Sequence, residues 1–293
     1  MALTEDLDRT EGFVETVSLA VGRRFSWGAL VILVGLQFVG NLAALPLLRF
    51  TDMPVEPAWA WLLWTAVSFV IVGIGLYLGG RVGLGAPLLE GRLRKGAVAG
   101  WSYRILALSL LVAIVGSLPF LLLNLGVSAG GYPPRWQLVL ASLDAGVQEE
   151  IFSRLFLVTL LAWLGGLVWR DEAGRPSKPV LWAAIILSGL AFGWAHVDEH
   201  ISDPQVRGAL AGVMLANSGF GVVFGWLYWT QGLESAMLAH FLVDAVGSAV
   251  VMPAYLAVNR WQGFLVSGGL LLGAALCCLY LVRQRPGSAR PQT

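Results

Sequence analysis

The sequence predicts an all-α, polytopic membrane protein with about eight transmembrane helices. Of its 293 residues, 57% are hydrophobic and only 13% are charged, and the mean hydropathy is +0.74, which lies far outside the balance of a soluble globular domain. A helix of about 20 apolar residues crosses the hydrocarbon core of a bilayer, so a chain of this length has room for eight crossings and short loops. The net charge of +1 gives no reason to expect a nucleic-acid partner.

Eight apolar runs are long enough to cross the bilayer, and polar or turn-rich joints separate them. They lie at about 26–48, 58–79, 105–124, 137–168, 181–200, 208–229, 234–257 and 262–282. The fourth run is long enough to be tilted or to begin with an interfacial helix. The link between the sixth and seventh runs is only Thr-Gln-Gly. Because this link carries no Lys or Arg, we expect it to be sunk within the protein.

The runs divide one membrane domain into four parts. These are a cytoplasmic N-terminal segment (1–25), the first three transmembrane helices (26–136), a core (137–257), and the last transmembrane helix with a cytoplasmic tail (258–293). Of the 19 Lys and Arg residues, 14 fall on the side that holds both termini, four fall on the opposite side, and Arg154 lies within the fourth run. Because cytoplasmic loops carry the excess of basic residues, both termini should be cytoplasmic. We expect an integral protein of a bacterial cytoplasmic membrane.

The fourth run contains charged residues, which are unfavourable in the hydrocarbon core of a bilayer. A charge at the middle of the bilayer costs between ~2.5 and ~10 kcal/mol, so such residues are candidates for function. Glu149 and Glu150 are neighbours, and about 100° of helix rotation separates them. Glu150 and Arg154 are four residues apart and can pair on one helix face. This pairing leaves Glu149 as the carboxylate without a local partner.

Two later runs each carry a histidine four residues from a second side chain. Phe192 and His196 share one helix face, and His240 and Asp244 share another. The carboxylate of Asp244 could fix the tautomer of the His240 imidazole or join it as a ligand. These pairs supply two of the three histidines in the chain.

The three motifs, EExxxR, FxxxH and HxxxD, occur in this order on successive membrane helices. In this the chain resembles the CPBP family, the CAAX-protease and bacteriocin-processing enzymes that are also called type II CAAX prenyl endopeptidases. The matched core runs from about Leu138 to Val250. The resemblance implies hydrolysis of a peptide bond in a membrane-associated protein or peptide, with Glu149 activating water and with Glu150 and Arg154 as its supporting pair.

The resemblance also assigns the remaining polar groups, in one of two ways. His196, His240 and Asp244 match groups that either bind a metal ion or polarise the scissile carbonyl. Amide hydrolysis needs a base for water and donors for the oxyanion, and a carboxylate with two imidazoles supplies both. Alternatively, His196, His240 and Glu149 would form a three-ligand zinc site with an open position, as in a metalloprotease. Zinc-dependent and metal-free catalysis both remain open at this point.

Two positions depart from the family pattern. Leu155 stands where many members have glycine after the arginine, and Ser153 replaces a usual aromatic residue. Both concern packing around the fourth helix, so they bear on the shape of the pocket more than on its chemistry.

Two other interpretations compete with this one. His196, Glu199 and His200 form an H-x-x-E-H sequence, which is the zinc signature of the inverzincins, but this stretch ends a membrane helix, so we interpret the match as chance. The buried charges could also be structural, in a carrier or in a non-catalytic scaffold or immunity factor. A degenerate family member would be expected to lose the base or a histidine, and this chain keeps both.

Overall fold

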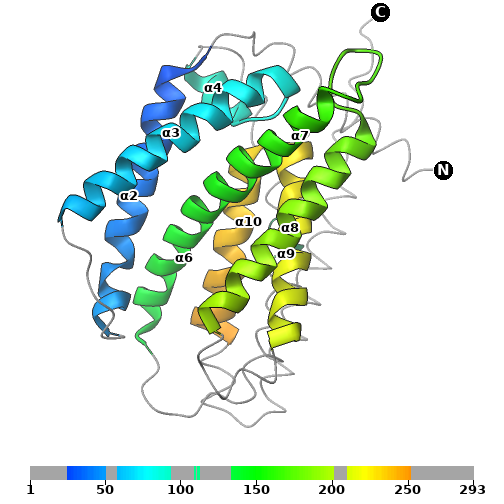
Figure 1. The fold of residues 1–293 in the computed structure, drawn as a ribbon. Helices are drawn as coiled ribbons and strands as arrows, with labels where there is room; N and C mark the ends of the chain where they lie inside the picture. Colours follow the sequence, from blue (N-terminus) through cyan, green and yellow to red (C-terminus); the bar gives the residue numbers. More distant parts are fainter. Residues whose placement is uncertain are drawn as a thin grey trace, which may run out of the picture.

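The computed structural model describes residues 25–50, 58–93, 109, 111–112, 133–200 and 210–251. The regular structure within these ranges is helical, apart from an isolated β-bridge between Arg170 and Pro176, so the predicted all-α class is confirmed there. Figure 1 shows these elements as one bundle of long helices with the short α4 at its upper end. In chain order they are α2 (Trp27–Phe50), α3 (Ala58–Val82), α4 (Pro87–Leu93), α6 (Arg135–Glu150), η1 (Ile151–Val158), α7 (Thr159–Gly166), α8 (Lys178–His200), α9 (Leu210–Gln231), α10 (Leu233–Val246) and η3 (Gly247–Val251).

Four of these helices are long and apolar enough to cross a bilayer. They correspond to the first, second, fifth and sixth predicted runs, and their candidate spans are Trp27–Leu47, Trp59–Val82, Lys178–Val197 and Leu210–Gln231. Large apolar side chains such as Leu62 and Leu215 are exposed on them, as a surface that faces lipid requires. Most of the third run and all of the eighth lie outside the described residues, as do both termini. The count of eight helices, the part boundaries and the orientation therefore stay predictions.

The fourth predicted run forms one continuous helix from α6 through η1 to α7. The backbone at the α6–η1 junction is helical, with φ −59° and ψ −49° at Ile151. The run is not α-helical throughout, because Ile151–Val158 adopt the wider π-helical geometry directly after the two glutamates. Segments of π-helix are rare and occur often at functional sites. Hydrophobic periodicity predicts a helix here, but it does not predict this local widening.

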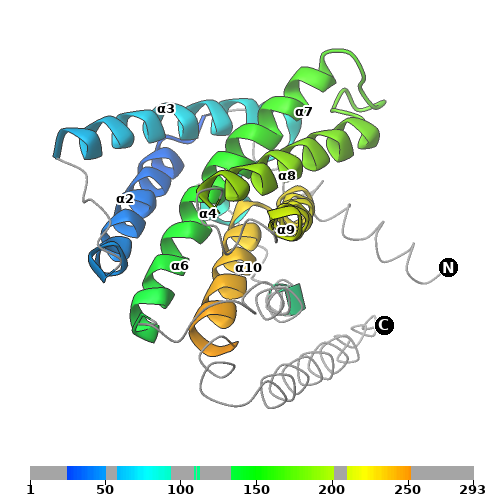
Figure 2. The same ribbon diagram turned by 60° about the horizontal axis from the view of Figure 1, so that its bottom comes forward.

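Small residues let neighbouring helices approach this central helix closely. Gly40 of α2 faces Asp144 of α6, while Gly146 of α6 faces Phe241 of α10, where an added Cβ atom would lie 3.0 Å from the Phe241 Cβ. Helices α2 and α10 therefore pack on different faces of α6, as Figure 2 shows. Close backbone approach at glycine is the usual way in which membrane helices gain van der Waals contact.

The short link between α9 and α10 is covered by the segment that joins α3 to α4. The Leu233 amide donates to the Gly85 carbonyl at 3.0 Å, and the Leu89 amide donates to Glu234 Oε1 at 2.8 Å. Thr230 and Gln231 are half-buried, while Gly232 and Leu233 are buried, so the end of the predicted link lies inside the protein. Helix α10 thus begins deep in the fold, and His240 reaches the level of the glutamates although it lies only seven residues after Leu233.

The contact between α8 and α9 leads to a first prediction. A Cβ atom at Gly193 would meet the Ser218 hydroxyl and would lie 2.5 Å from the Met214 carbonyl oxygen, whereas a Cβ at Gly219 would meet nothing within 4 Å. Gly193→Ala should therefore separate α8 from α9 and destabilise the protein by about 1–3 kcal/mol. Gly219→Ala should have almost no effect. Thermal unfolding in detergent checks this, and equal melting temperatures for the two variants would contradict it.

Candidate active site

The six predicted site residues lie on neighbouring helices that the fold brings together. Helix α6 lies beside α10 in Figure 2, and η1, which continues from α6, contacts both α8 and α10. Ion pairs or hydrogen bonds link the predicted residues across these helices. Glu149 and Glu150 come from α6, Arg154 from η1, His196 from α8, and His240 and Asp244 from α10.

Glu150 and Arg154 form a completely buried ion pair. Glu150 Oε2 lies 3.1 Å from Arg154 Nε, and neither side chain is exposed. Arg154 Nη2 donates to the Gly221 carbonyl at 3.4 Å, and its guanidinium carbon lies 4.6 Å from the centre of the Phe192 ring. The i, i+4 pairing that the sequence predicts is therefore present, and it links η1 to α8 and α9.

Glu150 also orients the imidazole of His240. The His240 Nδ1 atom lies 2.8 Å from Glu150 Oε1, and because a carboxylate can only accept, we assign the proton to Nδ1. Asp244, which the sequence suggested for this role, instead has its Oδ2 atom 3.4 Å from His240 Nε2. The residue that sets the tautomer of His240 is thus Glu150, on a different helix.

Two aromatic rings pack against the imidazole of His240. The Phe224 ring stacks on the imidazole with a centroid distance of 4.8 Å and an interplanar angle of 19°. Phe192 meets the same ring edge to face at 5.8 Å and lies 4.6 Å from the ring of His196. Phe192 therefore contacts both histidines. Sequence reasoning did not single out Phe224, because a phenylalanine in an apolar helix gives no signal beyond packing.

The carboxylate of Glu149 faces the second ring nitrogen of both histidines. Its Oε2 atom lies 3.7 Å from His196 Nε2 and 3.8 Å from His240 Nε2. These distances are too long for direct hydrogen bonds, but they suit one water molecule that bridges the three groups. Within the described part of the chain, this buried Oε2 atom has no hydrogen-bond partner. His196 Nδ1 donates to the Phe192 carbonyl at 2.9 Å, and its Nε2 faces Glu149.

Exposure separates these residues into two groups. The side chains of Glu149 and His196 are 34% and 23% exposed, and Asp244 is similarly accessible. Glu150 and Arg154 are completely buried. Glu149, His196 and Asp244 are therefore the groups that an incoming molecule can reach, while Glu150 and Arg154 can act only through their neighbours.

The distances among His196, His240 and Glu149 do not by themselves identify a metal site. Among the residues that the structure describes, no group of three or more His, Cys, Asp or Glu side chains is arranged to hold a metal ion. We therefore derive no step through a metal, and the set of His196, His240 and Glu149 stays a prediction. The side chains of Glu199 and His200, which complete the H-x-x-E-H sequence, lie outside the described part.

Asp144, an acidic residue in the same long helix, was not among the residues predicted from the sequence. Its Oδ1 atom is buried and has no hydrogen-bond partner among the described residues. It lies at the contact with α2, where an added Cβ at Gly40 would be 2.8 Å from this oxygen. The signal was present, because an aspartate within an apolar run is as unusual as the two glutamates.

The two departures from the family pattern both lie at helix contacts. Leu155 is completely buried and packs against α3 at Gly75, where a Cβ atom would lie 2.7 Å from Leu155 Cγ. The backbone carbonyl of Ser153 accepts a hydrogen bond from the Ser188 hydroxyl at 2.9 Å. A glycine in α3 therefore makes room for the larger side chain of Leu155.

The fold and this cluster define a helical membrane protein with a charged site among its apolar helices. Residues 131–246 match the family described as type II CAAX prenyl endopeptidase Rce1-like, so this part of the chain is similar to that family and the resemblance stated from the motifs is confirmed. The match includes all six predicted site residues. Comparison with curated proteins and comparison with solved structures gave no match.

Proposed function

We propose that this protein is an intramembrane endopeptidase in which Glu149 is the general base. The Rce1-like domain supports the class of enzyme. The observation that carries the assignment is the position of Glu149 Oε2, which lies 3.7 Å and 3.8 Å from Nε2 of His196 and His240. A water molecule at this point would contact a base and two imidazoles at once.

In the proposed reaction, the carboxylate of Glu149 removes a proton while the water oxygen attacks the carbonyl carbon of the peptide bond. His196 and His240 already carry a proton on Nδ1, so in this step each acts as an imidazolium, whose second N–H, at Nε2, donates a hydrogen bond to the oxyanion that forms. The tetrahedral intermediate then collapses, the C–N bond breaks, and Glu149 returns its proton to the leaving nitrogen. Asp244 lies close enough to His240 Nε2 to stabilise the charged imidazole.

Glu150 and Arg154 are positioning residues in this proposal. Glu150 holds His240 through Nδ1, while Arg154 balances the charge of Glu150. Phe192 and Phe224 fix the plane of the His240 ring. Together they keep the Nε2 atom of His240 aimed at Glu149, which is the preorganisation that electrostatic catalysis requires.

The substrate class follows from the family and needs a direct test. We propose that the substrate is a membrane-associated peptide with a prenylated C-terminal CAAX sequence. Purified protein in liposomes would be given two fluorogenic peptides of the same sequence, one farnesylated and one without the lipid. Faster cleavage of the farnesylated peptide supports the proposal. Equal rates would argue for a membrane protease that does not read the prenyl group, and cleavage of neither peptide would argue for a scaffold or carrier.

The two histidines of H-x-x-E-H should differ sharply in their effect on turnover. His196→Gln removes a group that faces Glu149, so we expect turnover to fall by about 10²-fold or more. His200→Ala and Glu199→Gln should cause only modest losses. Rates on the peptide that the wild type cleaves check this. An inactive but folded Glu199→Gln variant would contradict the assignment and favour the inverzincin signature.

Zinc dependence can be tested separately. We expect turnover to survive prolonged treatment with a chelator, because in the proposed reaction Glu149 and the two histidines act directly on the water and the oxyanion. Rates before and after chelation, with zinc or magnesium added back, provide the measurement. Loss of turnover that returns with zinc alone would instead assign His196, His240 and Glu149 as metal ligands.

A further inference from the structure

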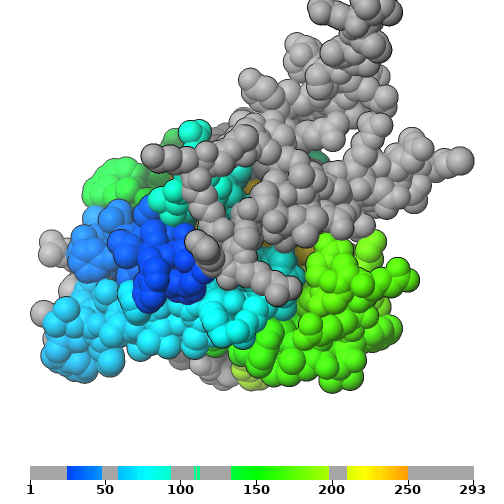
Figure 3. All heavy atoms as spheres, turned by 90° about the horizontal axis from the view of Figure 1, so that it is seen from above, coloured from blue at the N-terminus to red at the C-terminus, as the bar shows by residue number. Residues whose placement is uncertain are grey.

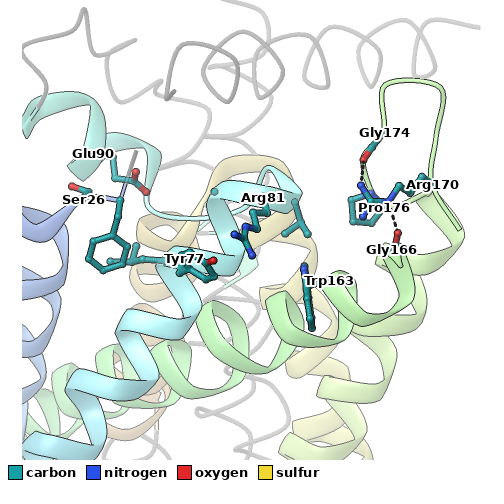
Figure 4. Close-up of a pocket in the computed structure, with 13 residues that line it drawn as sticks. Ser26, Tyr77, Arg81, Glu90, Trp163, Gly166, Arg170, Gly174 and Pro176 are labelled. Atoms are coloured by element: carbon teal, nitrogen blue, oxygen red, sulfur yellow. Dashed lines mark hydrogen bonds between the residues drawn. The ribbon is translucent and has the colours of Figure 1, made fainter. Parts of the chain in front are cut away.

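A cleft of about 470 Å³ lies at the end of the bundle that carries α4 and the α7–α8 hairpin. It opens between the start of α2, the end of α3, α4 and the end of α7, and Figure 4 shows its lining residues. In the space-filling view from this end, the start of α2 (dark blue), α3 (light blue) and the hairpin (green) lie next to one another (Figure 3). Trp163 in this cleft is 14 residues after Glu149 along one helix, or about 21 Å at 1.5 Å per residue. The cleft is therefore separate from the catalytic cluster.

Arg81 projects into the middle of this cleft, between Tyr77 and Trp163 (Figure 4). Its guanidinium carbon lies 4.0 Å from the centre of the Tyr77 ring. Among the described residues Arg81 makes no hydrogen bond or ion pair. A cation–π contact holds the guanidinium by its face and leaves the N–H groups at its edge able to donate to a ligand.

Arg170 lies at one end of the cleft, away from Ser26 and Glu90 (Figure 4). Its Nε atom donates to the Gly166 carbonyl at 2.7 Å, and its Nη1 atom donates to the Gly174 carbonyl at 3.1 Å. These bonds fix the guanidinium at the base of the hairpin while its Nη2 group is left to bind. A guanidinium binds phosphate oxygens through its planar N–H groups, and each of these two arginines has such groups available in the cleft.

The acidic residue of the cleft lies away from Arg170. Figure 4 places Glu90 beside Ser26, at the end opposite Arg170. Glu90 Oε1 accepts from the Ala86 amide at 3.4 Å and is engaged within its own segment. Glu90 therefore does not neutralise the part of the cleft that lies between Arg81 and Arg170.

The cleft lies at the level of the membrane surface, as the end of the α3 span indicates. The transmembrane span of α3 ends at Val82, the residue after Arg81, so Arg81 lies at the level of the lipid head groups. The segment that follows α7 carries exposed apolar side chains, since Val168 is 91% exposed and the adjacent Trp169 is also exposed. Tryptophan and tyrosine are concentrated at this level in membrane proteins.

We propose that this cleft binds the phosphodiester group of a membrane phospholipid, with Arg81 and Arg170 on the phosphate oxygens and the acyl chains in the adjoining bilayer. The two guanidinium groups supply the positive charge that a phosphate needs, and the end of α3 places them at the level of the lipid head groups. The class of ligand is a glycerophospholipid rather than a soluble phosphate, because the cleft opens where the transmembrane span ends.

The test is thermal unfolding of the full protein in detergent micelles with three additions at equal concentration. These are phosphatidylglycerol, diacylglycerol with the same acyl chains, and inorganic phosphate. We expect phosphatidylglycerol to raise the melting temperature by about 3–6 °C, since a ligand that binds only the folded state stabilises it. Diacylglycerol and inorganic phosphate should each cause almost no shift. An equal shift with diacylglycerol would overturn recognition of the phosphate, and an equal shift with inorganic phosphate would overturn the assignment to lipid.

Variants locate the effect within the cleft. Arg81→Gln should lose most of the shift, while Arg81→Lys should retain part of it. Arg175→Gln is the matched control, because Arg175 lies on the same hairpin but pairs with Asp171 outside the cleft lining. Gly80→Glu gives a second route, since Gly80 lines the cleft with open space around it, and a carboxylate there should abolish the shift. A full shift in Arg81→Gln and in Gly80→Glu would overturn the proposal.

Discussion

Glu149→Gln should abolish turnover while leaving the protein folded. Glutamine keeps the size of the side chain but lacks the basic carboxylate, so the water between Glu149, His196 and His240 would no longer lose its proton. A general base contributes roughly 10²-fold or more, so the rate on the prenylated peptide should fall by at least this factor. The side chain of Glu149 is partly exposed and has no ion pair to Arg154 in the described structure, so the melting temperature should change little.

A second carboxylate on the same helix provides the matched control. Asp144→Asn makes the same chemical change at the α2–α6 contact, where an added Cβ at Gly40 would touch it. We expect its turnover to stay within a few-fold of the wild type. If Asp144→Asn were as inactive as Glu149→Gln, the loss of any buried carboxylate from this helix would be enough to abolish turnover. The specific role of Glu149 would then be wrong.

The motifs could be predicted from the sequence because their pairs are local. Glu150 and Arg154 lie four residues apart on one helix, and this spacing alone predicts the ion pair observed at 3.1 Å. The same argument leaves Glu149 without a local partner, in agreement with its position between two imidazoles. The apolar runs likewise predict the ends of α2, α8 and α9 to within a few residues.

The contacts between helices could not be predicted in this way. Spacing on α10 predicts the pair of His240 and Asp244, which is present at 3.4 Å. It does not predict the shorter contact of His240 Nδ1 with Glu150 on α6. The stacking of Phe224 on the imidazole also crosses from one helix to another. Such contacts depend on the level in the membrane at which each helix begins, and a single sequence does not give that level.

The depth of α10 shows the physical reason most clearly. If every helix began at the membrane surface, His240 would lie over 10 Å from the level of Glu149 at 1.5 Å per residue. The structure removes the conflict because residues 85–89 cover the start of α10, where the Gly85 carbonyl accepts from the Leu233 amide and the Leu89 amide donates to the Glu234 side chain. A buried helix start is possible where protein rather than lipid surrounds it, and the hydropathy pattern does not distinguish the two.

Glu150→Ala should destabilise the folded protein by about 3–5 kcal/mol, the cost of leaving one charge of a buried pair without its partner. Arg154 would keep its guanidinium between the rings of Phe192 and Phe224 with no carboxylate to balance it. His240 would also lose the acceptor of its Nδ1 proton. The melting temperature in detergent and the yield of folded protein measure this effect, and both should fall well below those of Glu149→Gln.

A double-mutant cycle separates this charge effect from simple loss of packing. Glu150→Met combined with Arg154→Met removes both charges and keeps most of the volume, so the double variant should be more stable than either single variant. Its turnover should still be low, because the imidazole of His240 is no longer oriented. Additive losses in the cycle would show that the ion pair is not the source of the stability. A Glu149→Gln variant that unfolds, beside a stable and inactive Glu150→Gln variant, would reverse the two roles and make Glu150 the base.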